Sequence, residues 1–142
     1  MRKIGIAAGA VLVVSQVVWA ASLELTGWDV TVTPDAQAQA AGEHAFKDTL
    51  IFSQGAMTSS ACVKFGFGES AYAASETSGT ISWATNQQSV KSGKTRWEGA
   101  IKGNAIHGSL AWQRLDGKVF QYAFEGTRKT VKSGKSSSKK RR

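Results

Sequence analysis

The chain has 142 residues, a formal net charge of +8 at pH 7 and a single cysteine, Cys62. This length suits one domain, and one cysteine excludes an intramolecular disulfide, so the fold must be stabilised by its core alone. Residues 128–142 contain eight basic residues and no acidic one, whereas residues 21–127 contain eight basic and ten acidic residues, a net charge of −2. The basic character of the mature protein therefore lies in its C-terminal tail.

Residues 1–20 have the pattern of a secretory signal peptide. Arg2 and Lys3 precede the apolar run Ile4–Val18, and Val18-Trp19-Ala20 supplies small residues at the positions that a signal peptidase reads. The apolar run is shorter than the ~20 residues that a membrane-spanning helix needs. We expect cleavage after Ala20 and a secreted or periplasmic protein with no transmembrane segment; the alternative is a retained N-terminal anchor.

The body, residues 21–127, has the alternation and the glycine-containing turns of an all-β domain. Ala36–Phe46, rich in Ala and Gln, is predicted as a short helix or an ordered loop after the first strand. We expect eight strands, at Leu23–Thr33, Thr49–Ser53, Met57–Phe65, Ala71–Ala74, Thr80–Thr85, Thr95–Lys102, Ala105–Gln113 and Lys118–Gly126. Short connections allow each strand to pair with the next, so a closed antiparallel up-and-down (meander) barrel is favoured over a flattened sandwich, because closure removes the exposed edges.

The turns predict the register. A two-residue turn at Gly103-Asn104 pairs Trp97 with Leu110, and a Gln54-Gly55 turn pairs Phe52 with Met57. A three-residue loop ending at a left-handed Gly117 pairs Trp112 with Phe120 and Gly108 with Phe124, which keeps one face apolar. The inward face is then predicted to contain Leu50, Phe52, Met57, Val63, Ile81, Trp83, Trp97, Ile101, Ile106, Leu110, Trp112, Phe120, Tyr122 and Phe124.

With eight strands in this order, the chain resembles the lipocalin-like (calycin) barrels. The first strand contains Leu25-Thr26-Gly27-Trp28, similar to that family's early Gly-x-Trp signature, and the last strand ends Glu125-Gly126-Thr127-Arg128. The resemblance covers nearly the whole body. It implies the eight-stranded meander and a basic side chain of the last strand placed over the first-strand tryptophan, as a cation–π contact.

Eight strands enclose an interior just wide enough for side chains or for one small ligand. We therefore expect a non-catalytic binding protein for a small apolar or aromatic ligand in the barrel. The candidate pocket residues are Trp28, Trp83, Trp97, Gly99, Gly108, Trp112, Tyr122 and Phe124. The alternative is that the large rings fill the space that the glycines leave, as the pair Gly108 and Phe124 suggests.

The tail provides the second functional hypothesis, contact between an envelope protein and an anionic lipid or polymer surface. Its candidate residues are Lys129, Lys132, Lys135, Lys139, Lys140, Arg141 and Arg142. The tail contains no aromatic residue to stack on bases, which argues against nucleic acid. A solvated tail that only aids solubility is the alternative.

The sequence argues against an enzyme, a metal site or a cofactor. His44 and His107 are the only histidines, and His107 falls on the outward face of its strand. No cysteine pair, nucleophile elbow, phosphate-binding loop or dinucleotide fingerprint is present. We expect Cys62 to be a small buried hydrophobe with a reduced thiol, and the protein to be a monomer.

Overall fold

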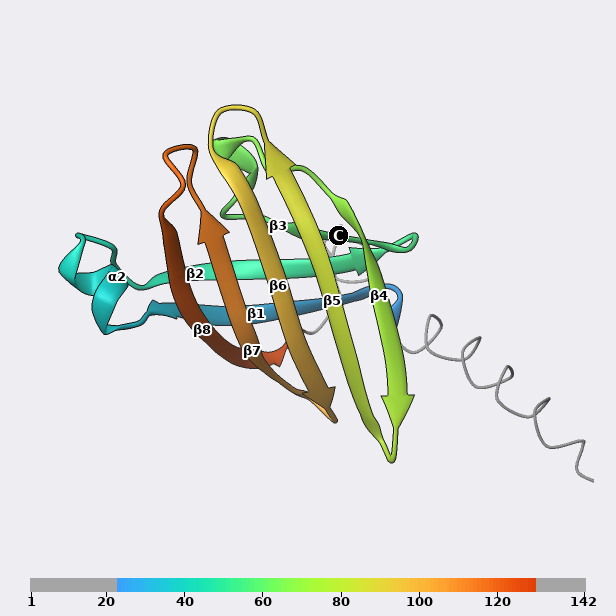
Figure 1. The fold of residues 1–142 in the computed structure, drawn as a ribbon. Helices are drawn as coiled ribbons and strands as arrows, with labels where there is room; N and C mark the ends of the chain where they lie inside the picture. The colour runs from blue at the N-terminus through green and yellow to red at the C-terminus, as the bar shows by residue number, and fades with distance from the viewer. Residues whose placement is uncertain (1–22, 130–142) are drawn as a thin grey trace, which may run out of the picture.

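A computed structural model describes residues 23–129, and its strands form one closed barrel in the order β1-β2-β3-β4-β5-β6-β7-β8 (Figure 1). The elements are β1 (Thr26–Pro34), α2 (Ala36–Ala40), β2 (Phe46–Ser53), β3 (Ala56–Ser59), the 3₁₀ helix η2 (Val63–Phe65), β4 (Ser70–Thr77), β5 (Thr80–Ser89), β6 (Gly93–Lys102), β7 (Ala105–Gln113) and β8 (Val119–Arg128). Every pair of neighbouring strands is antiparallel. The predicted fold class is confirmed. The predicted signal peptide and residues 130–142 of the tail lie outside the described residues.

The predicted registers are also confirmed. Trp97 pairs with Leu110 across the β6–β7 hairpin, and Phe52 pairs with Met57 across the β2–β3 hairpin. Trp112 pairs with Phe120, as the three-residue loop requires, and Gly117 has a φ of 91°. The pleat then sends alternate side chains inward, which gives the buried-exposed alternation along β5 and β8.

Several strand boundaries were predicted wrongly. Three strands are longer than predicted, because β2 begins at Phe46, β4 runs from Ser70 to Thr77 and β5 continues to Ser89. Two other boundaries change the path of the chain. The first strand begins at Thr26 and not at Leu23, because Leu25 has a left-handed φ of 63° that breaks the extended backbone. The predicted strand Met57–Phe65 ends at Ser59, after which the chain turns and forms η2. The carboxylate of Asp48 holds that turn, since it accepts hydrogen bonds from the Ser59 hydroxyl and from the Ala61 backbone N–H. Val63, predicted to face inward, is consequently 50% exposed.

The segment after β1 was predicted as either a short helix or an ordered loop, and it contains a one-turn helix, α2. Asp35 is the N-cap of α2, and its carboxylate accepts a hydrogen bond of 2.8 Å from the Ala38 backbone N–H. Ala38 is buried, and α2 packs against β8 and β1. The rest of the segment leads to Phe46 at the start of β2, and within it Glu43 accepts a hydrogen bond from the Tyr122 hydroxyl of β8.

Close strand approach at two glycines lets the barrel curve tightly. A Cβ added to Gly108 in β7 would lie 2.0 Å from the carbonyl oxygen of Glu98 in β6. One added to Gly126 in β8 would lie 1.9 Å from the carbonyl oxygen of Asp29 in β1. No side chain fits at either position, so these strands approach one another more closely than strands with larger residues could.

Candidate functional site

The middle of the barrel is filled by aromatic rings. The ring centroids of Phe52 and Trp83 are 4.9 Å apart at an interplanar angle of 79°. Phe124 contacts both Trp83, at 6.0 Å, and Trp97, at 5.3 Å. All four residues are at most 3% exposed. Edge-to-face and tilted packing is favourable for aromatic pairs. It leaves three of the predicted pocket residues, Trp83, Trp97 and Phe124, in the core.

Gly99 and Gly108 make room for those rings and do not open a cavity. A Cβ at Gly99 would lie 2.9 Å from three atoms of the Trp83 indole, and a Cβ at Gly108 would lie 2.8 Å from Cζ of Phe124. The filled-core alternative therefore holds for the centre of the barrel.

Trp28 closes the end of the barrel at which β1 begins. Its indole N–H donates a hydrogen bond of 2.9 Å to the hydroxyl of Thr26, and the guanidinium of Arg128 lies 5.7 Å from its ring centroid. This is the cation–π contact that the lipocalin-like resemblance implies. Since Trp28 is only 1% exposed, it belongs to the closed end and not to a pocket.

The opposite end contains a partly enclosed cavity of about 460 Å³. Its walls come from β2, β6, β7 and β8 and from the segment that follows β3. The apolar lining consists of Phe46, Ala61, Cys62, Phe65, Phe67, Leu110, Trp112 and Tyr122, and the polar lining of Glu43, Lys47, Lys64 and Thr95. Trp112 and Tyr122 are the two predicted pocket residues that line it. An apolar hollow with a few polar groups at its edge is the usual form of a small-molecule site.

Hydrogen bonds hold both predicted aromatic residues in place. The Tyr122 hydroxyl donates to Oε1 of Glu43 at 2.8 Å, and the pKa of Tyr122 is raised by burial and by this carboxylate. Phe46 stands edge-on to Tyr122, with centroids 6.1 Å apart. The indole N–H of Trp112 donates to the carbonyl of Ser92 at 2.7 Å. Both rings are therefore oriented by the protein itself.

A buried polar cluster adjoins the cavity at Thr95, which is one of its lining residues. Gln87 is 2% exposed, and its Oε1 accepts from the Thr95 hydroxyl and from the Trp97 indole, each at 3.0 Å. Its Nε2 donates to the carbonyl of Gly68 at 2.9 Å. These buried polar groups thus bond one another.

Cys62 borders the cavity as a buried thiol, 8% exposed. Burial raises its pKa to about 11, with a hydrogen bond from Ser59 acting in the opposite direction and the charge of Asp48 adding to the rise. The pKa of Asp48 is itself raised by burial, although hydrogen bonds from Ser59, Ala61 and Thr49 partly offset the effect. A thiol with this pKa is protonated at neutral pH and unreactive, which agrees with the expected sequestered cysteine.

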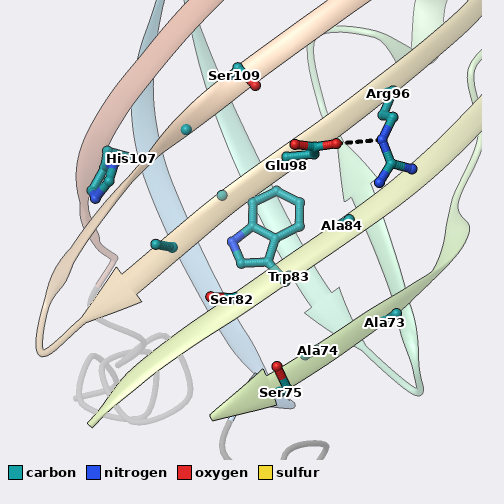
Figure 2. A pocket seen from close by; sticks show the side chains of 13 residues that line it. Ala73, Ala74, Ser75, Ser82, Trp83, Ala84, Arg96, Glu98, His107 and Ser109 are labelled. Carbon is teal, nitrogen blue, oxygen red and sulfur yellow. Dashed lines mark hydrogen bonds and ion pairs between the residues drawn. The ribbon is translucent and has the colours of Figure 1, made fainter. Parts of the chain in front are cut away.

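A second hollow, of about 840 Å³, lies on the outer face of β4, β5, β6 and β7 and is widely open to solvent (Figure 2). Its lining is made mostly of small side chains, with the Arg96–Glu98 ion pair at 2.6 Å along one side. His107 points outward here, as predicted. Figure 2 shows the indole of Trp83 through the space between the ribbons of β5 and β6; the side chain belongs to the core, and its N–H has no hydrogen-bond partner within the described structure. This shallow surface encloses nothing, so the candidate site is the cavity at the barrel end.

Sequence reasoning missed several lining residues. Phe46 is on the inward face of β2, in line with Leu50 and Phe52, but the predicted strand began only at Thr49. Extending the alternation backward would have found it. Phe67 lies in the segment between η2 and β4, where no local pattern marks it as buried.

Some predicted features remain outside the cavity. Lys129 is the one residue of the tail set in the described region, and its Nζ lies 3.8 Å from a carboxylate oxygen of Asp29. The other six tail residues are outside that region. Within residues 23–129 no three His, Cys, Asp or Glu side chains gather in a metal-binding arrangement, and no helix there could span a bilayer.

Comparison with models of protein families, with curated protein sequences and with solved structures finds no match to this chain. The candidate site therefore stands on the geometry of the chain's own residues.

Proposed function

We propose that this protein binds a small apolar or aromatic ligand, without catalysis, in the cavity at the open end of the barrel. The observation that carries the proposal is the cavity itself, about 460 Å³ in volume and lined by rings from four different segments. That volume lies within the range of ligand pockets, about 300–1,000 Å³. Because Tyr122 and Trp112 are already hydrogen-bonded, a ligand would not have to order them and would lose little affinity to that cost.

The test is a fluorescence titration of the full-length protein with phenylnaphthylamine, an uncharged aromatic probe that emits strongly in apolar surroundings. We expect saturable binding at one site, with energy transfer from Trp112, which lines the cavity. Ala61→Phe places a ring in the cavity and should weaken binding by at least about ten-fold.

Ala73→Phe is the matched control, since Ala73 is exposed on the outer face of β4, away from the cavity. Binding by this variant should equal that of the wild type. A signal that rises linearly with probe concentration, or a titration that Ala61→Phe leaves unchanged, would refute the proposal.

Kinship with the lipocalin-like barrels and export by a cleaved signal peptide are parts of the same proposal. The meander barrel and the contact between Arg128 and Trp28 support the first. The sequence of residues 1–20 supports the second. Sequencing the N-terminus of the mature protein tests export: a chain that begins at Ala21 is expected, and one that begins at Met1 would contradict it.

Contact between the basic tail and an anionic lipid or polymer surface is the second candidate function. The sequence carries it, because the tail's basic residues are unbalanced by acidic ones. If the tail makes this contact, deleting residues 129–142 should abolish salt-dependent binding of the protein to anionic vesicles. Binding that the deletion leaves unchanged would show that the tail does not contact the vesicles.

A further inference from the structure

Large apolar side chains are exposed on three loops at one end of the barrel. Val63 and Phe65 in η2 are 50% and 51% exposed, Val90 in the β5–β6 loop is 98% exposed, and Leu115 in the β7–β8 loop is 68% exposed. Of the other large hydrophobics exposed within residues 23–129, Val119 begins β8 beside the last of these loops, and only Leu25 and Ile51 lie elsewhere. Such side chains normally occur singly and scattered, so their gathering at one end requires an explanation.

The three loops form one surface, which we call the apolar rim. Ser89, at the end of β5, and Ser92, in the β5–β6 loop, both donate hydrogen bonds to the carbonyl of Phe65, at 2.8 and 2.7 Å. Ser92 also accepts the hydrogen bond from Trp112, immediately before the β7–β8 loop. Figure 1 shows η2 and both loops at the same end of the barrel. The apolar rim borders the ligand cavity, which Phe65 and Trp112 also line.

The same loops carry a positive charge that the rest of the folded body does not. Residues 23–129 contain ten basic and ten acidic residues, which is a net charge of zero. The rim segments 63–66, 89–93 and 113–119 contain four basic residues, Lys64, Lys91, Arg114 and Lys118, and one acidic residue, Asp116. Their net charge of +3 is balanced by −3 elsewhere in the described region, so the positive charge is concentrated where the apolar tips are exposed.

We propose that the apolar rim docks onto an anionic lipid surface, with Val63, Phe65, Val90 and Leu115 entering the headgroup region and the flanking basic residues contacting lipid phosphates. Basic residues beside short apolar insertions are the combination that favours binding at a membrane interface. The four tips stand on three separate segments and alternate with charged or polar residues, whereas the core of a protein–protein interface is depleted in charge. This surface differs from the basic tail and would place the mouth of the cavity against the lipid.

The test measures partition of the full-length protein onto vesicles of phosphatidylcholine containing roughly one third phosphatidylglycerol, an anionic fraction that attracts basic residues. Val90→Ser combined with Leu115→Ser should weaken partition by about ten-fold or more. Lys91→Gln combined with Lys118→Gln should weaken it by about five-fold or more for each lysine. Both pairs lie on exposed positions, so the fold should be kept.

The controls change matched residues at the other end of the barrel. Leu25→Ser removes a leucine that is 78% exposed, and Lys102→Gln removes an exposed lysine beside the β6–β7 turn. Neither should change partition. Partition that both rim pairs leave unchanged, or that is lost only when residues 129–142 are deleted, would overturn the proposal.

A second measurement reports insertion directly. Because Cys62 is buried, Val90→Cys creates one accessible thiol for a polarity-sensitive fluorophore. We expect its emission to shift to the blue on addition of the vesicles, and the same label at Leu25→Cys to remain unchanged. Equal emission shifts at the two sites would refute docking by the apolar rim. So would an emission shift at position 90 that added proteins cause and lipid vesicles do not.

Discussion

Gly108→Ala tests whether the strands approach as closely as the structure indicates. The added Cβ would lie 2.0 Å from the carbonyl oxygen of Glu98 and 2.6 Å from Cα of Gly99. A relaxed contact between carbon and oxygen is about 3.3–3.6 Å, so β6 and β7 would have to separate by about 1 Å. Overpacking usually costs ~1–3 kcal/mol, and each weakened ladder hydrogen bond adds ~1 kcal/mol. We expect a loss of ~3–5 kcal/mol.

Such a loss is a large part of the ~5–15 kcal/mol that stabilises a domain of this size. Urea unfolding followed by tryptophan fluorescence measures it, and with a slope of ~1–3 kcal/mol per molar urea the midpoint should fall by more than about 1 M. Gly117→Ala is the control: no atom lies within 4 Å of its added Cβ, but its φ is +91°. That variant should lose only the ~1–2 kcal/mol of a left-handed backbone.

Gly99→Ala separates contacts with a side chain from contacts with backbone. Its Cβ would meet the Trp83 indole at 2.9 Å and no backbone atom as closely. Trp83→Phe should therefore recover part of the stability that Gly99→Ala removes, which a double-mutant cycle detects as a coupling of ~0.5–3 kcal/mol. No change at Phe124 should rescue Gly108→Ala in the same way, since its first clash is with backbone. Equal losses for Gly108→Ala and Gly117→Ala would refute this account of the barrel's curvature.

Three further predictions concern titration, ligand charge and thiol reactivity. Burial raises the pKa of Asp48 above 3.8, so the folded state binds its proton more tightly than the unfolded state, and stability decreases as pH rises from 3.8 through the raised pKa. Urea unfolding across this range should show the wild type losing stability relative to Asp48→Asn, and a relative gain with rising pH would contradict the assignment. Lys47 and Lys64 line the cavity without an ion pair to any carboxylate of residues 23–129. The anionic probe anilinonaphthalene sulfonate should therefore bind up to about five-fold tighter per lysine than the uncharged phenylnaphthylamine. The double variant Lys47→Gln, Lys64→Gln should remove this preference and Lys102→Gln should keep it, whereas equal affinities for the two probes in the wild type would exclude a role for the lysines. A thiol with a pKa of about 11 that is 8% exposed should react with a coloured disulfide reagent only when the protein unfolds, and rapid reaction of Cys62 in the folded state would show that it is accessible.

The barrel could be predicted because its signals are local. Alternation along β6, β7 and β8 fixes which side chains share a face, and the turns at Gly103 and Gly117 fix how the strands pair. Trp112 and Tyr122 follow from the same register, which is why these two lining residues were found from the sequence.

The errors occur where distant contacts decide the local structure. Asp48 is an acidic residue on an inward face, so the sequence pattern places the start of the strand after it. Its carboxylate can be buried because Ser59 and Ala61, eleven and thirteen residues later, donate hydrogen bonds to it. η2 has local backbone hydrogen bonds of its own, but its place against the β5–β6 loop is fixed by hydrogen bonds from Ser89 and Ser92 to Phe65, across 24 and 27 residues. No window along the sequence contains both partners of such a bond.

Gln87 illustrates the same difficulty and bears on how a ligand is chosen. The predicted strand stopped at Thr85, because Gln87 and Ser89 do not resemble inward residues, yet β5 continues to Ser89. A buried amide is costly unless its hydrogen bonds are made, and here Thr95, Trp97 and Gly68 make them.

This satisfied amide limits what the cavity can recognise. Because the hydroxyl hydrogen of Thr95 and the N–H of Trp97 already point at Gln87, neither is free to donate to a ligand. The Trp112 and Tyr122 donors are likewise used by Ser92 and Glu43. The charged side chains that remain along the lining are Lys47, Lys64 and Glu43, of which the two lysines carry the positive charge. A ligand that these lysines select would meet the same positive end of the barrel that the apolar rim presents to a lipid surface.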